Sequence, residues 1–522
     1  MNRYISKYEI KNNNLNKLKV KINNKKFIKQ ELKNSKILLD NINGYSLDVK
    51  QRLAIITNED NNLIIAGAGS GKTLTIVGKI RYLIERLNVS KEEILCISFT
   101  NDSVNSLKCA LSKNYNYDLD IFTFHKLALN IIRSNNLDVK IAHQYDLEYI
   151  IDEFFYSNVP NLKILKKENI NKYIHFKNLI ITFINLFKSN NYKYDKFDEF
   201  LDGLKYCDDY IFIKVVRQIY LEYQAELKSK NEVDFNDMIN NAINIVKNDG
   251  YIKQYKYIII DEYQDTSLTK YELIKEIKRK TKAKLFAVGD DFQSIYRFTG
   301  CNLDIFLNFD KYYGFSKIMK IENTYRNSRE LINIAGKFIM KNKKQMRKRL
   351  RSNKRLYKPL KIVYFKNQKS TFLKLLLKLY DEYKSSILIL GRNNKDIYNV
   401  IDDNFKLMDD GKLIYTKNNY IHIRYLTMHK SKGLEDENVI IINLQNNNLG
   451  FPSKIESNKV LHYVLHENDY YPYEEERRLF YVALTRTKNN VYLLVNKDNP
   501  SIFVKELIKN YRLNIQIINE LL

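Results

Sequence analysis

Apolar residues along this chain fall into short continuous runs and into longer stretches at helical spacing. The run that starts at Leu63 in LIIAGAGSGKT passes through glycines into TLTIVGKIRYLIERL, whose apolar residues recur on one helix face. A short apolar run predicts a buried strand, and the recurring spacing predicts an amphipathic helix. EILCISFT (93–100) predicts a second buried strand. A strand, a glycine-rich loop and a helix therefore begin an α/β domain.

Residues 131–233 differ, because their pattern is helical and carries no strong strand signal. After them, KYIIIDEYQD (256–265) and KLFAVGDD (284–291) each carry a short apolar run that ends in carboxylates. Acidic residues in that position are typical of the C-terminal edge of a parallel sheet. The helical block is thus predicted to be an insertion, after which the first domain resumes.

A second group of apolar runs predicts a second α/β domain. Helical stretches such as TFLKLLLKLYDEY separate these runs, which are LKIVYF, SILILG, VIIINL and NVYLLVN. The predicted organisation is a basic N-terminal extension at 1–45, a first α/β domain at 46–130 and 234–300, a helical insertion at 131–233, and a second α/β domain at 301–522.

The charge of the chain favours a polyanionic partner. Lysine and arginine exceed aspartate and glutamate, giving a net charge of +27 over 522 residues. Such an excess attracts nucleic acid through long-range fields and counterion release. A/T-rich codon usage would also enrich lysine, so charge alone only leans toward nucleic acid. The strongly basic run at 341–358 fits either a solvated linker or a DNA contact.

Membrane and secretory signals are not found in the sequence. No apolar run is long enough to cross a bilayer, and the start, MNRYISKYEI, has no apolar signal core. The cysteines form no Cys-x-x-Cys pair, so neither a zinc knuckle nor a disulfide framework is predicted. We therefore expect a cytoplasmic, nucleoid-associated protein without a membrane partner.

The segment AGAGSGKT (66–73) fits a phosphate-binding loop. Its glycines let backbone N–H groups close around phosphates, Lys72 can neutralise phosphate oxygens, and the Thr73 hydroxyl can hold Mg²⁺. In DEYQD, Asp261 can hold the metal through water, and Glu262 can act as general base on the attacking water. Two acids at a strand end would by themselves fit a solvated turn. Combined with the loop, they predict an ATPase site.

Several further segments, taken in order, resemble the motifs of superfamily 1A helicases of the UvrD/Rep type. The wording of some of them is most similar to the DNA helicase IV branch. The segments are AGAGSGKT (66–73), SFTN (98–101), TFHKLAL (123–129), DFNDM (234–238), DEYQD (261–265), VGDDFQSIYRFTG (288–300), TYRNS (324–328), TMHKSKGLE (427–435) and EEERRLFYVALTRTK (474–488). This resemblance spans nearly the whole chain.

The resemblance implies an α/β fold of two RecA-like P-loop NTPase domains with ATP between them, and a helical 1B insertion. Gln51 would read adenine, Tyr325 would stack on the base, and Glu435 would meet the ribose. The nucleotide contacts implied in this way are Gln51, Ala66, Gly67, Ala68, Gly69, Ser70, Gly71, Lys72, Thr73, Leu74, Tyr325, Gly433 and Glu435.

Catalysis would use residues of both domains. Arg326 and Arg486 lie where the family keeps its arginine fingers, which offset charge on the departing γ-phosphoryl group. Gln293 lies where the family couples the ATP cleft to the DNA track. The implied catalytic residues are Lys72, Glu262, Gln293, Arg326 and Arg486, and the implied Mg²⁺ ligands are Thr73 and Asp261.

For nucleic acid, aromatic faces give sequence-tolerant stacking on unpaired bases, while hydroxyl and amide groups follow the phosphates. Many UvrD-type chains have Trp-Arg-Gly after the third motif, whereas this chain has Phe298-Thr299-Gly300, so phenylalanine must do the stacking. Phe99 and Phe124 could instead belong to the core. The predicted contacts are Phe99, Thr100, Asn101, Phe124, His125, Tyr296, Phe298, Thr427 and His429.

The resemblance implies an ATP- and Mg²⁺-dependent DNA helicase that moves 3′ to 5′ on single-stranded DNA and unwinds duplex in repair, replication or recombination. Its expected partners are single-stranded and partly duplex DNA, with a protein loading partner as a further option, and it would act as a monomer. The stretch from Arg326 to His429 is too short to hold the large 2B insertion of UvrD and Rep. A DNA-stimulated ATPase switch or loading module without processive unwinding, and an RNA motor, remain as alternatives.

Overall fold

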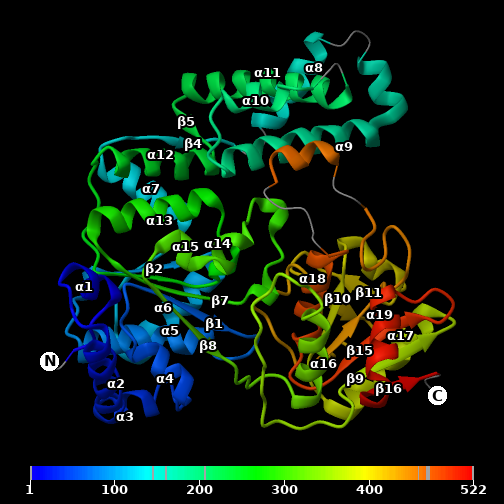
Figure 1. The fold of residues 1–522 in the computed structure, drawn as a ribbon. Helices are drawn as coiled ribbons and strands as arrows, with labels where there is room; N and C mark the ends of the chain where they lie inside the picture. The colour runs from blue at the N-terminus through cyan, green and yellow to red at the C-terminus, as the bar shows by residue number, and fades with distance from the viewer. Residues whose placement is uncertain are drawn as a thin grey trace.

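The computed structural model describes residues 3–143, 146–158, 162–204, 207–455, 458–465 and 471–519. Over these residues the chain forms two α/β domains side by side, with a helical domain above them (Figure 1). The first domain lies on the blue and green side of the view, and the second on the yellow and red side. The predicted fold class, parallel sheets flanked by helices, is confirmed.

The first sheet has the strand order β3-β2-β6-β7-β1-β8, and all of its described pairings are parallel. Its strands are β1 (Asn61–Ala66), β2 (Ile94–Ser98), β3 (Asp120–Thr123), β6 (Tyr257–Ile260), β7 (Lys284–Gly289) and β8 (Ser316–Ile321). Because side chains alternate along a strand, Leu63 and Ile65 face one helical layer while Ile64 and Ala66 face the other. Burial on both faces explains the continuous apolar runs in the sequence.

Two layers of helices cover this sheet. One layer contains α4 (Val49–Ile56), α5 (Lys72–Arg81) and α6 (Asn101–Tyr115), and the other contains α7 (Phe124–Ser134), α12 (Phe235–Lys247) and α13 (Leu268–Thr281). The loops at the C-terminal ends of β1, β6 and β7 hold the glycine-rich loop and both acidic motifs. Parallel pairing therefore brings these distant segments to one edge.

The predicted domain boundary at residue 300 is wrong. Strand β8 pairs with β1 from Asn61 opposite Ser316 to Ala66 opposite Ile321. The helices before it, α14 (Leu303–Leu307) and α15 (Phe309–Tyr313), contribute to the core of the first domain. The first domain thus continues to Ile321. The sequence signal was weak because β8 is an edge strand whose central side chains are largely exposed.

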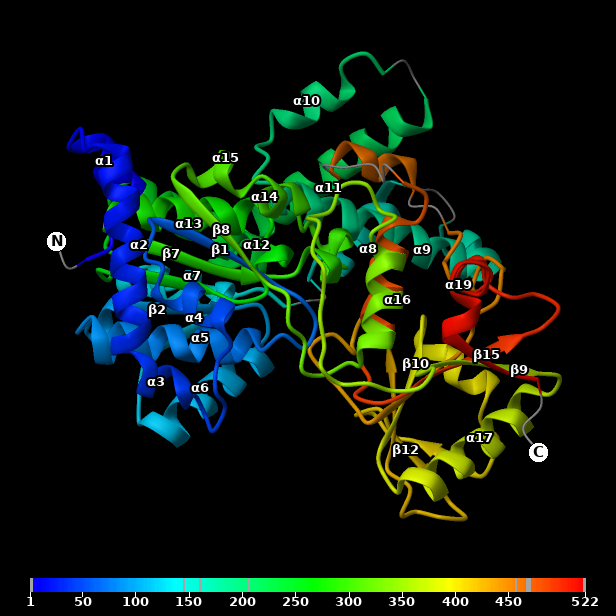
Figure 2. The same cartoon turned by 60° about the horizontal axis from the view of Figure 1, so that its bottom comes forward.

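The N-terminal extension is part of the first domain rather than an appendage. It forms α1 (Lys7–Asn12), α2 (Lys17–Asn34) and α3 (Lys36–Asp40), and Figure 2 shows α2 running along the side of this domain. Leu39 lies in the same hydrophobic cluster as α5. The backbone N–H of Lys7 donates to Glu59 Oε1 at 2.6 Å, and Lys7 Nζ donates to the Ser316 oxygen at 2.8 Å.

The second sheet has the order β11-β12-β13-β10-β14-β15-β9-β16, antiparallel only at the β11-β12-β13 end among the described pairings. Its strands are β9 (Leu360–Phe365), β10 (Ile387–Gly391), β11 (Phe405–Leu407), β12 (Lys412–Tyr415), β13 (Ile423–Thr427), β14 (Asn438–Ile441), β15 (Val491–Asn496) and β16 (Ile515–Ile518). Helices α16 (Arg329–Ile339), α18 (Glu474–Leu484) and α19 (Ile502–Tyr511) cover one face, and α17 (Gln368–Tyr383) covers the other. From Arg326 to His429, the chain is taken up by α16, a linker, α17 and strands of this sheet.

Most of the described residues between 131 and 233 are helical. They form α8 (Asp146–Asn158), α9 (Leu162–Ser189), α10 (Lys196–Leu201) and α11 (Asp208–Ser229), joined to the first domain next to a short ladder of β4 (Lys140–Ile141) and β5 (Glu232–Val233). At this joint the buried Lys188 ammonium forms ion pairs with Asp234 and Asp237. None of the described helices has the length and apolar character needed to cross a membrane.

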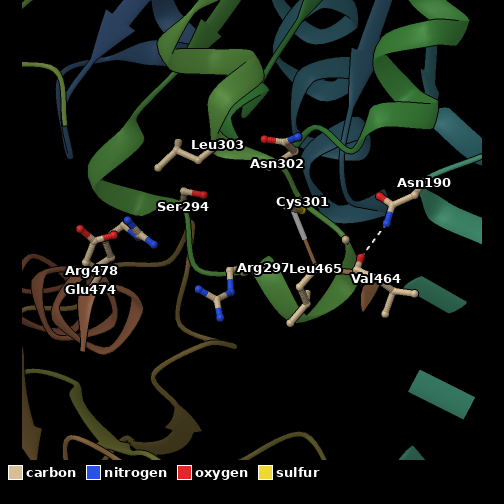
Figure 3. Close-up of a pocket in the computed structure, with 11 residues that line it drawn as sticks. Asn190, Ser294, Arg297, Cys301, Asn302, Leu303, Val464, Leu465, Glu474 and Arg478 are labelled. Atoms are coloured by element: carbon tan, nitrogen blue, oxygen red, sulfur yellow. Dashed lines mark hydrogen bonds between the residues drawn. The ribbon is translucent and has the colours of Figure 1, made fainter. Parts of the chain in front are cut away.

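One segment of the second domain packs on the helical domain. We call residues 458–465, which include the short helix η7 (Lys459–Tyr463), the strap. Val460, Leu461 and Val464 of the strap are buried in the aromatic core of the helical domain. Figure 3 shows Asn190 donating to the Val464 backbone oxygen, at 2.6 Å. This contact was not predicted from the sequence, since it joins residues far apart in the chain.

The variant Val464→Asp is expected to release the strap. Burial of a valine side chain contributes about 2 kcal/mol, and an unpaired buried carboxylate adds a further penalty. Trypsin should therefore cleave faster at Lys459, while the unfolding of the two α/β domains changes little. Leu449→Asp is the control, because Leu449 is already 66% exposed. Equal cleavage rates in wild type and both variants would show that Val464 does not hold the strap.

Candidate ATP site and nucleic-acid track

The glycine-rich loop between β1 and α5 is shaped by close neighbours. Gly69 and Gly71 have φ of 68° and 77°, the left-handed region that other residues rarely adopt. A Cβ on Gly69 would lie 2.5 Å from Cβ of Arg326, and one on Gly71 would lie 2.8 Å from Gln51 Nε2. Ser70 Oγ is buried, with no hydrogen-bond partner among the described residues. These features fit a loop whose backbone closes around phosphates.

Lys72 and Glu262 meet across this loop. Lys72 Nζ lies 2.8 Å from Glu262 Oε1, and Gln264 Nε2 donates to Glu262 Oε2 at 2.5 Å. Burial raises the pKa of Glu262, but Lys72 and Lys432 outweigh it and lower the pKa to about 2. Glu262 also has φ of 49°, a strained backbone of the kind that persists where function requires it. The side chain is therefore a fixed carboxylate.

The predicted metal ligands lie at the same edge. Asp261 follows β6, and its Oδ1 accepts from the Glu262 N–H at 2.8 Å. Burial and the neighbouring Glu262 raise the pKa of Asp261 to about 6. Thr73 lies in the first turn of α5 and is exposed. An aspartate and a hydroxyl are oxygen donors of the type that Mg²⁺ prefers.

The predicted adenine contacts lie together on the far side of the loop. Gln51 Oε1 accepts from the Asp48 N–H at 2.8 Å, and Gln51 Nε2 donates to the Ser70 oxygen at 3.1 Å. These bonds fix the orientation of the Gln51 amide. The Tyr325 ring is 60% exposed, and its hydroxyl donates to Asp48 Oδ2 at 3.0 Å. Leu74 is partly buried and packs against the core of the first domain.

The two predicted arginine fingers have different surroundings. Arg486 is almost fully buried, and its Nη2 donates to Gln293 Oε1 at 3.4 Å. Burial and the neighbouring Arg326 lower the pKa of Arg486 to about 9, which leaves it charged at neutral pH. Arg326 Nε forms an ion pair with Glu435 Oε2 at 2.5 Å, next to the left-handed Gly433. The structure therefore brings both arginines to the cleft between the domains.

Lys432 was not predicted as a site residue from the sequence. Its ammonium forms a buried ion pair with Asp265 of the first domain and donates to the Gln293 oxygen at 2.7 Å. The same ammonium lies 4.8 Å from the centre of the Tyr296 ring. Lys432 thus links the second domain to both the ATP cleft and the predicted DNA track. Its place within HKSKGLE, between His429 and Glu435, was the signal that could have drawn attention to it.

Three predicted nucleic-acid contacts form an aromatic cluster between the two domains. The Phe298 ring centre lies 6.1 Å from that of Tyr296 and 5.8 Å from that of His429. Phe298 is 56% exposed, so more than half of its surface is open to solvent. Burial, with Arg392 and Lys432, lowers the pKa of His429 to about 4 and keeps the ring neutral at pH 7.

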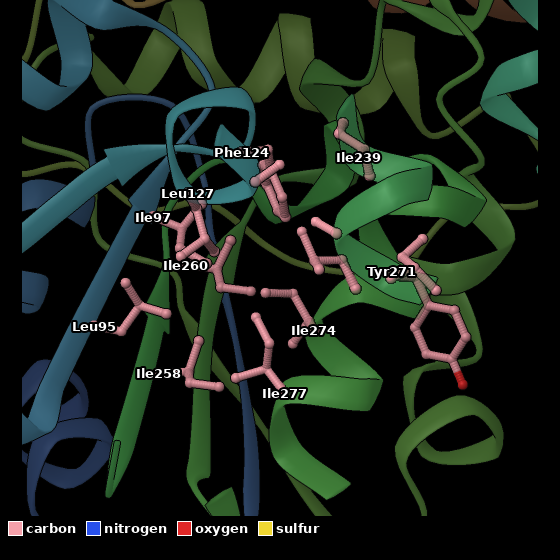
Figure 4. Packing of buried hydrophobic residues seen from close by; sticks show 14 of the residues in the cluster. Leu95, Ile97, Phe124, Leu127, Ile239, Ile258, Ile260, Tyr271, Ile274 and Ile277 are labelled. Atoms are coloured by element: carbon pink, nitrogen blue, oxygen red, sulfur yellow. The ribbon is translucent and has the colours of Figure 1, made fainter. Parts of the chain in front are cut away.

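The prediction that Phe124 contacts nucleic acid is wrong. Figure 4 shows Phe124 within the core of the first domain, where its side chain is 2% exposed. It packs edge-on against Phe99, at 5.2 Å between ring centres, and Phe99 remains partly exposed. Lys270 Nζ lies 4.6 Å from the Phe99 ring centre. Phe124 is therefore a core residue against which the Phe99 ring packs.

The other predicted contacts lie at the ends of helices and strands. Thr100 caps α6 by accepting from the Ser103 N–H at 3.2 Å, and Asn101 begins that helix with its side chain exposed. Thr427 ends β13 and is half-buried. The His125 ring lies 5.1 Å from that of Phe235, which is 56% exposed and was not singled out from the sequence.

Burial and the nearby Lys270 lower the pKa of His125 to about 4, so this ring is also neutral at pH 7. Two histidines that the sequence offered as DNA contacts are thus uncharged. Any contact they make with a phosphate uses a neutral N–H donor rather than a cation.

Comparison with known proteins agrees with this geometry. Residues 47–314 match the UvrD/REP helicase N-terminal domain, and residues 407–498 match the UvrD-like helicase C-terminal domain. The chain is 28% identical over 501 residues to DNA helicase IV of Escherichia coli, covering 89% of this chain and 70% of that protein.

Two further relatives match over shorter stretches. The chain is 32% identical over 310 residues to the ATP-dependent DNA helicase PcrA of Leuconostoc citreum, covering 58% of this chain and 40% of PcrA. It is 29% identical over 358 residues to the ATP-dependent DNA helicase Rep of Buchnera aphidicola, covering 66% of this chain and 52% of Rep. The matched part is thus about half the length of these two relatives. Because the N-terminal family domain alone covers more than half of the chain, the protein belongs to the UvrD/REP helicase family.

Proposed function

We propose that this chain is an ATP-dependent DNA helicase and translocase that moves 3′ to 5′ on single-stranded DNA and unwinds duplex. The observation that carries the proposal is the contact between Arg486 of the second domain and Gln293 of the first, beside the pair of Lys72 and Glu262. Residues that act on one phosphate are thereby divided between two domains. The names of the relatives and the net positive charge support DNA as the polymer.

The residues present fit MgATP. Gly69 and Gly71 leave no room for a Cβ beside Arg326 and Gln51, and Ser70 Oγ in the same loop is a buried atom without a described partner. Thr73 and Asp261 would hold Mg²⁺, and Gln51 and Tyr325 would hold the base. Bound MgATP supplies the γ-phosphoryl group whose transfer to water provides the free energy for movement.

The roles of the protein residues follow from their charge. Lys72 would neutralise the phosphate oxygens, which requires it to leave its ion pair with Glu262. Glu262, then released, would accept a proton from the attacking water. Arg326 and Arg486 would offset negative charge on the departing phosphoryl group, so hydrolysis depends on closure of the two domains. Repeated closure would move the strand past Phe298 and His429.

Two other functions would use the same fold. A DNA-stimulated switch or loading module would hydrolyse ATP without unwinding, and an RNA motor would respond to RNA instead of DNA. Strand displacement on a duplex with a 3′ single-stranded tail distinguishes a helicase from a switch or loading module. The same assay with a 5′ tail tests polarity, and stimulation of ATP hydrolysis by single-stranded RNA tests for an RNA motor. A role in repair, replication or recombination, a nucleoid location and a monomeric state belong to this proposal as well.

The test of the proposed function is ATP hydrolysis by the full-length protein with and without single-stranded DNA. We expect strong stimulation by DNA, because the Gln293 and Lys432 contacts join the ATP site to the aromatic cluster. Hydrolysis that does not respond to DNA would contradict a DNA motor.

Phe298→Ala is expected to weaken single-stranded DNA binding about tenfold, because loss of stacking on one base costs about 1 to 3 kcal/mol. The concentration of DNA that gives half-maximal ATPase stimulation should rise accordingly, while DNA-free hydrolysis is unchanged. Phe315→Ala is the control, since Phe315 is a partly exposed phenylalanine of the first domain away from the cluster. Equal DNA dependence in both variants would remove Phe298 from the DNA track.

A further inference from the structure

The basic run at 341–358, which we call the linker, contacts the glycine-rich loop and the acidic motif of the first domain. The Met346 N–H donates to Asp291 Oδ2 at 2.8 Å, and the Leu350 side chain fills the place that a Cβ on Gly67 would need. Further on, the Arg351 N–H donates to the Glu322 oxygen, and the Arg351 oxygen accepts from the Thr324 N–H, both at 2.7 Å. Neither sequence-based interpretation, solvated linker or DNA contact, describes this middle part.

Lys348 is the buried cation of the linker. Its side chain has no exposed surface, and its ammonium forms ion pairs with Asp290 and Asp291, whose side chains are equally buried. The distance to Asp291 Oδ1 is 2.6 Å, and the ammonium lies 3.6 Å from the centre of the Phe292 ring. The ammonium thus neutralises one of two adjacent buried carboxylates.

Asp290 connects this cation to the catalytic residues. Its Oδ2 accepts from Gln293 Nε2 at 2.6 Å, and Gln293 Oε1 accepts in turn from Arg486 Nη2 at 3.4 Å. The Asp290 N–H donates to Gln264 Oε1 at 2.8 Å, and Gln264 Nε2 donates to Glu262 Oε2. Asp290 therefore joins Lys348 to the coupling glutamine through its carboxylate, and it reaches the general base through its backbone N–H and Gln264.

We propose that Lys348 is a positioning residue that sets the orientation of Gln293 through Asp290. The side-chain amide of glutamine can be turned by half a rotation, which exchanges its oxygen and its NH₂ group. With Lys348 on Oδ1, Oδ2 of Asp290 is left to accept from the Gln293 NH₂ group, so the amide oxygen faces Arg486. Without the cation, the Asp290 side chain loses the partner that holds its Oδ1, so the carboxylate can turn and the Gln293 amide is no longer held in one orientation. The inference rests on the proposed ATPase function, which it deepens.

The burial of Lys348 indicates that its ammonium does more than add positive charge to the surface. The linker carries several lysines and arginines, and Lys343, Arg347 and Arg349 are exposed while Lys348 is not. Burying an ammonium costs free energy unless it is paired, and here two carboxylates and an aromatic face surround it. The linker joins α16 of the second domain to strand β9, so Lys348 brings a residue of that domain against the acidic motif of the first.

The experiment compares Lys348→Met with Arg349→Met in full-length protein, under saturating single-stranded DNA and with ATP titrated. Arg349→Met is a matched control because it removes one cation from the adjacent, exposed position. We expect Lys348→Met to lower kcat about tenfold with KM for ATP changed by less than about twofold, the size of effect typical of a supporting partner. The control should match wild type.

A second comparison tests the route of the effect. In a Gln293→Ala background, Lys348→Met should lower kcat by less than about twofold more, because the residue it positions is gone. If Lys348→Met does not fold, the pair Lys348→Met with Asp291→Asn keeps the net buried charge and should show the same loss of kcat. Thermal unfolding monitors folding of every variant.

Three results would overturn the inference alone: an active wild type with unchanged kcat in Lys348→Met, a loss that appears only in KM or in stability, or a tenfold loss that persists in the Gln293→Ala background. A wild type without DNA-stimulated turnover would instead overturn the proposed function, and this inference with it. Strong stimulation with a loss confined to kcat and to intact Gln293 supports both.

Discussion

Replacing Glu262 with glutamine is expected to stop ATP turnover while ATP binding persists. The carboxylate is the only base at this edge of the described site that contacts Lys72, at 2.8 Å, and its lowered pKa keeps it ionised. Glutamine has the same shape but cannot accept the proton, so kcat should fall about 10³-fold, a loss typical of a missing general base. Binding of a fluorescent ATP analogue, measured alongside single-turnover hydrolysis, separates the two effects.

Glu199→Gln provides the control for this variant, since Glu199 lies on the helical domain with 64% of its side chain exposed. It should hydrolyse ATP at the wild-type rate. Loss of ATP binding in Glu262→Gln would indicate that the carboxylate mainly holds the loop in place. Retention of more than about a tenth of the wild-type kcat would mean that another group takes the proton.

The variant Arg486→Met should lose nearly as much activity. Arg486 is buried between the domains, and its guanidinium donates to Gln293 Oε1, Val482 O and Leu434 O. Methionine keeps much of the apolar stem but removes the charge that would offset the departing phosphoryl group. An arginine finger is worth about 10³-fold or more in kcat, and we expect a loss of that order with little change in KM for ATP.

The loss of turnover in Arg326→Met is to be compared with the loss in Arg486→Met. Arg326 is already paired with Glu435 at 2.5 Å, so part of its charge is compensated and its loss should cost less than that of Arg486. Arg329→Met is the control, because Arg329 is exposed at the start of α16. Wild-type turnover in Arg486→Met would contradict the arginine-finger assignment, and wild-type turnover in Arg329→Met is required for the comparison to hold.

Much of the ATP site could be predicted because its parts are local in sequence. A glycine-rich loop needs a strand before it and a helix after it, and both leave clear apolar patterns around residues 66–73. Asp261 and Glu262 follow a buried strand for the same reason, and parallel pairing then places them beside the loop. The order of motifs supplied the partners on the second domain, Arg326 and Arg486.

The two wrong predictions, the domain boundary at residue 300 and the role of Phe124, have different causes. Strand β8 was missed because an edge strand with exposed lysines lacks the continuous apolar run of the inner strands. Phe124 was assigned to nucleic acid because a motif names a residue type and not the face it presents. Burial of Phe124 depends on α12 and α13, which lie more than one hundred residues further along the chain.

The two α/β domains, the helical insertion and the candidate phosphate loop could be predicted from local patterns, because strand periodicity and loop chemistry are short-range properties. Which cations are buried depends on long-range contacts and could not be predicted in this way. Lys348 and Lys432 look like their exposed neighbours in the sequence, and they acquire partners only when Asp290, Asp291 and Asp265 are folded against them. The packing of the strap could not be predicted for the same reason, since its apolar residues are buried by contact with the helical domain.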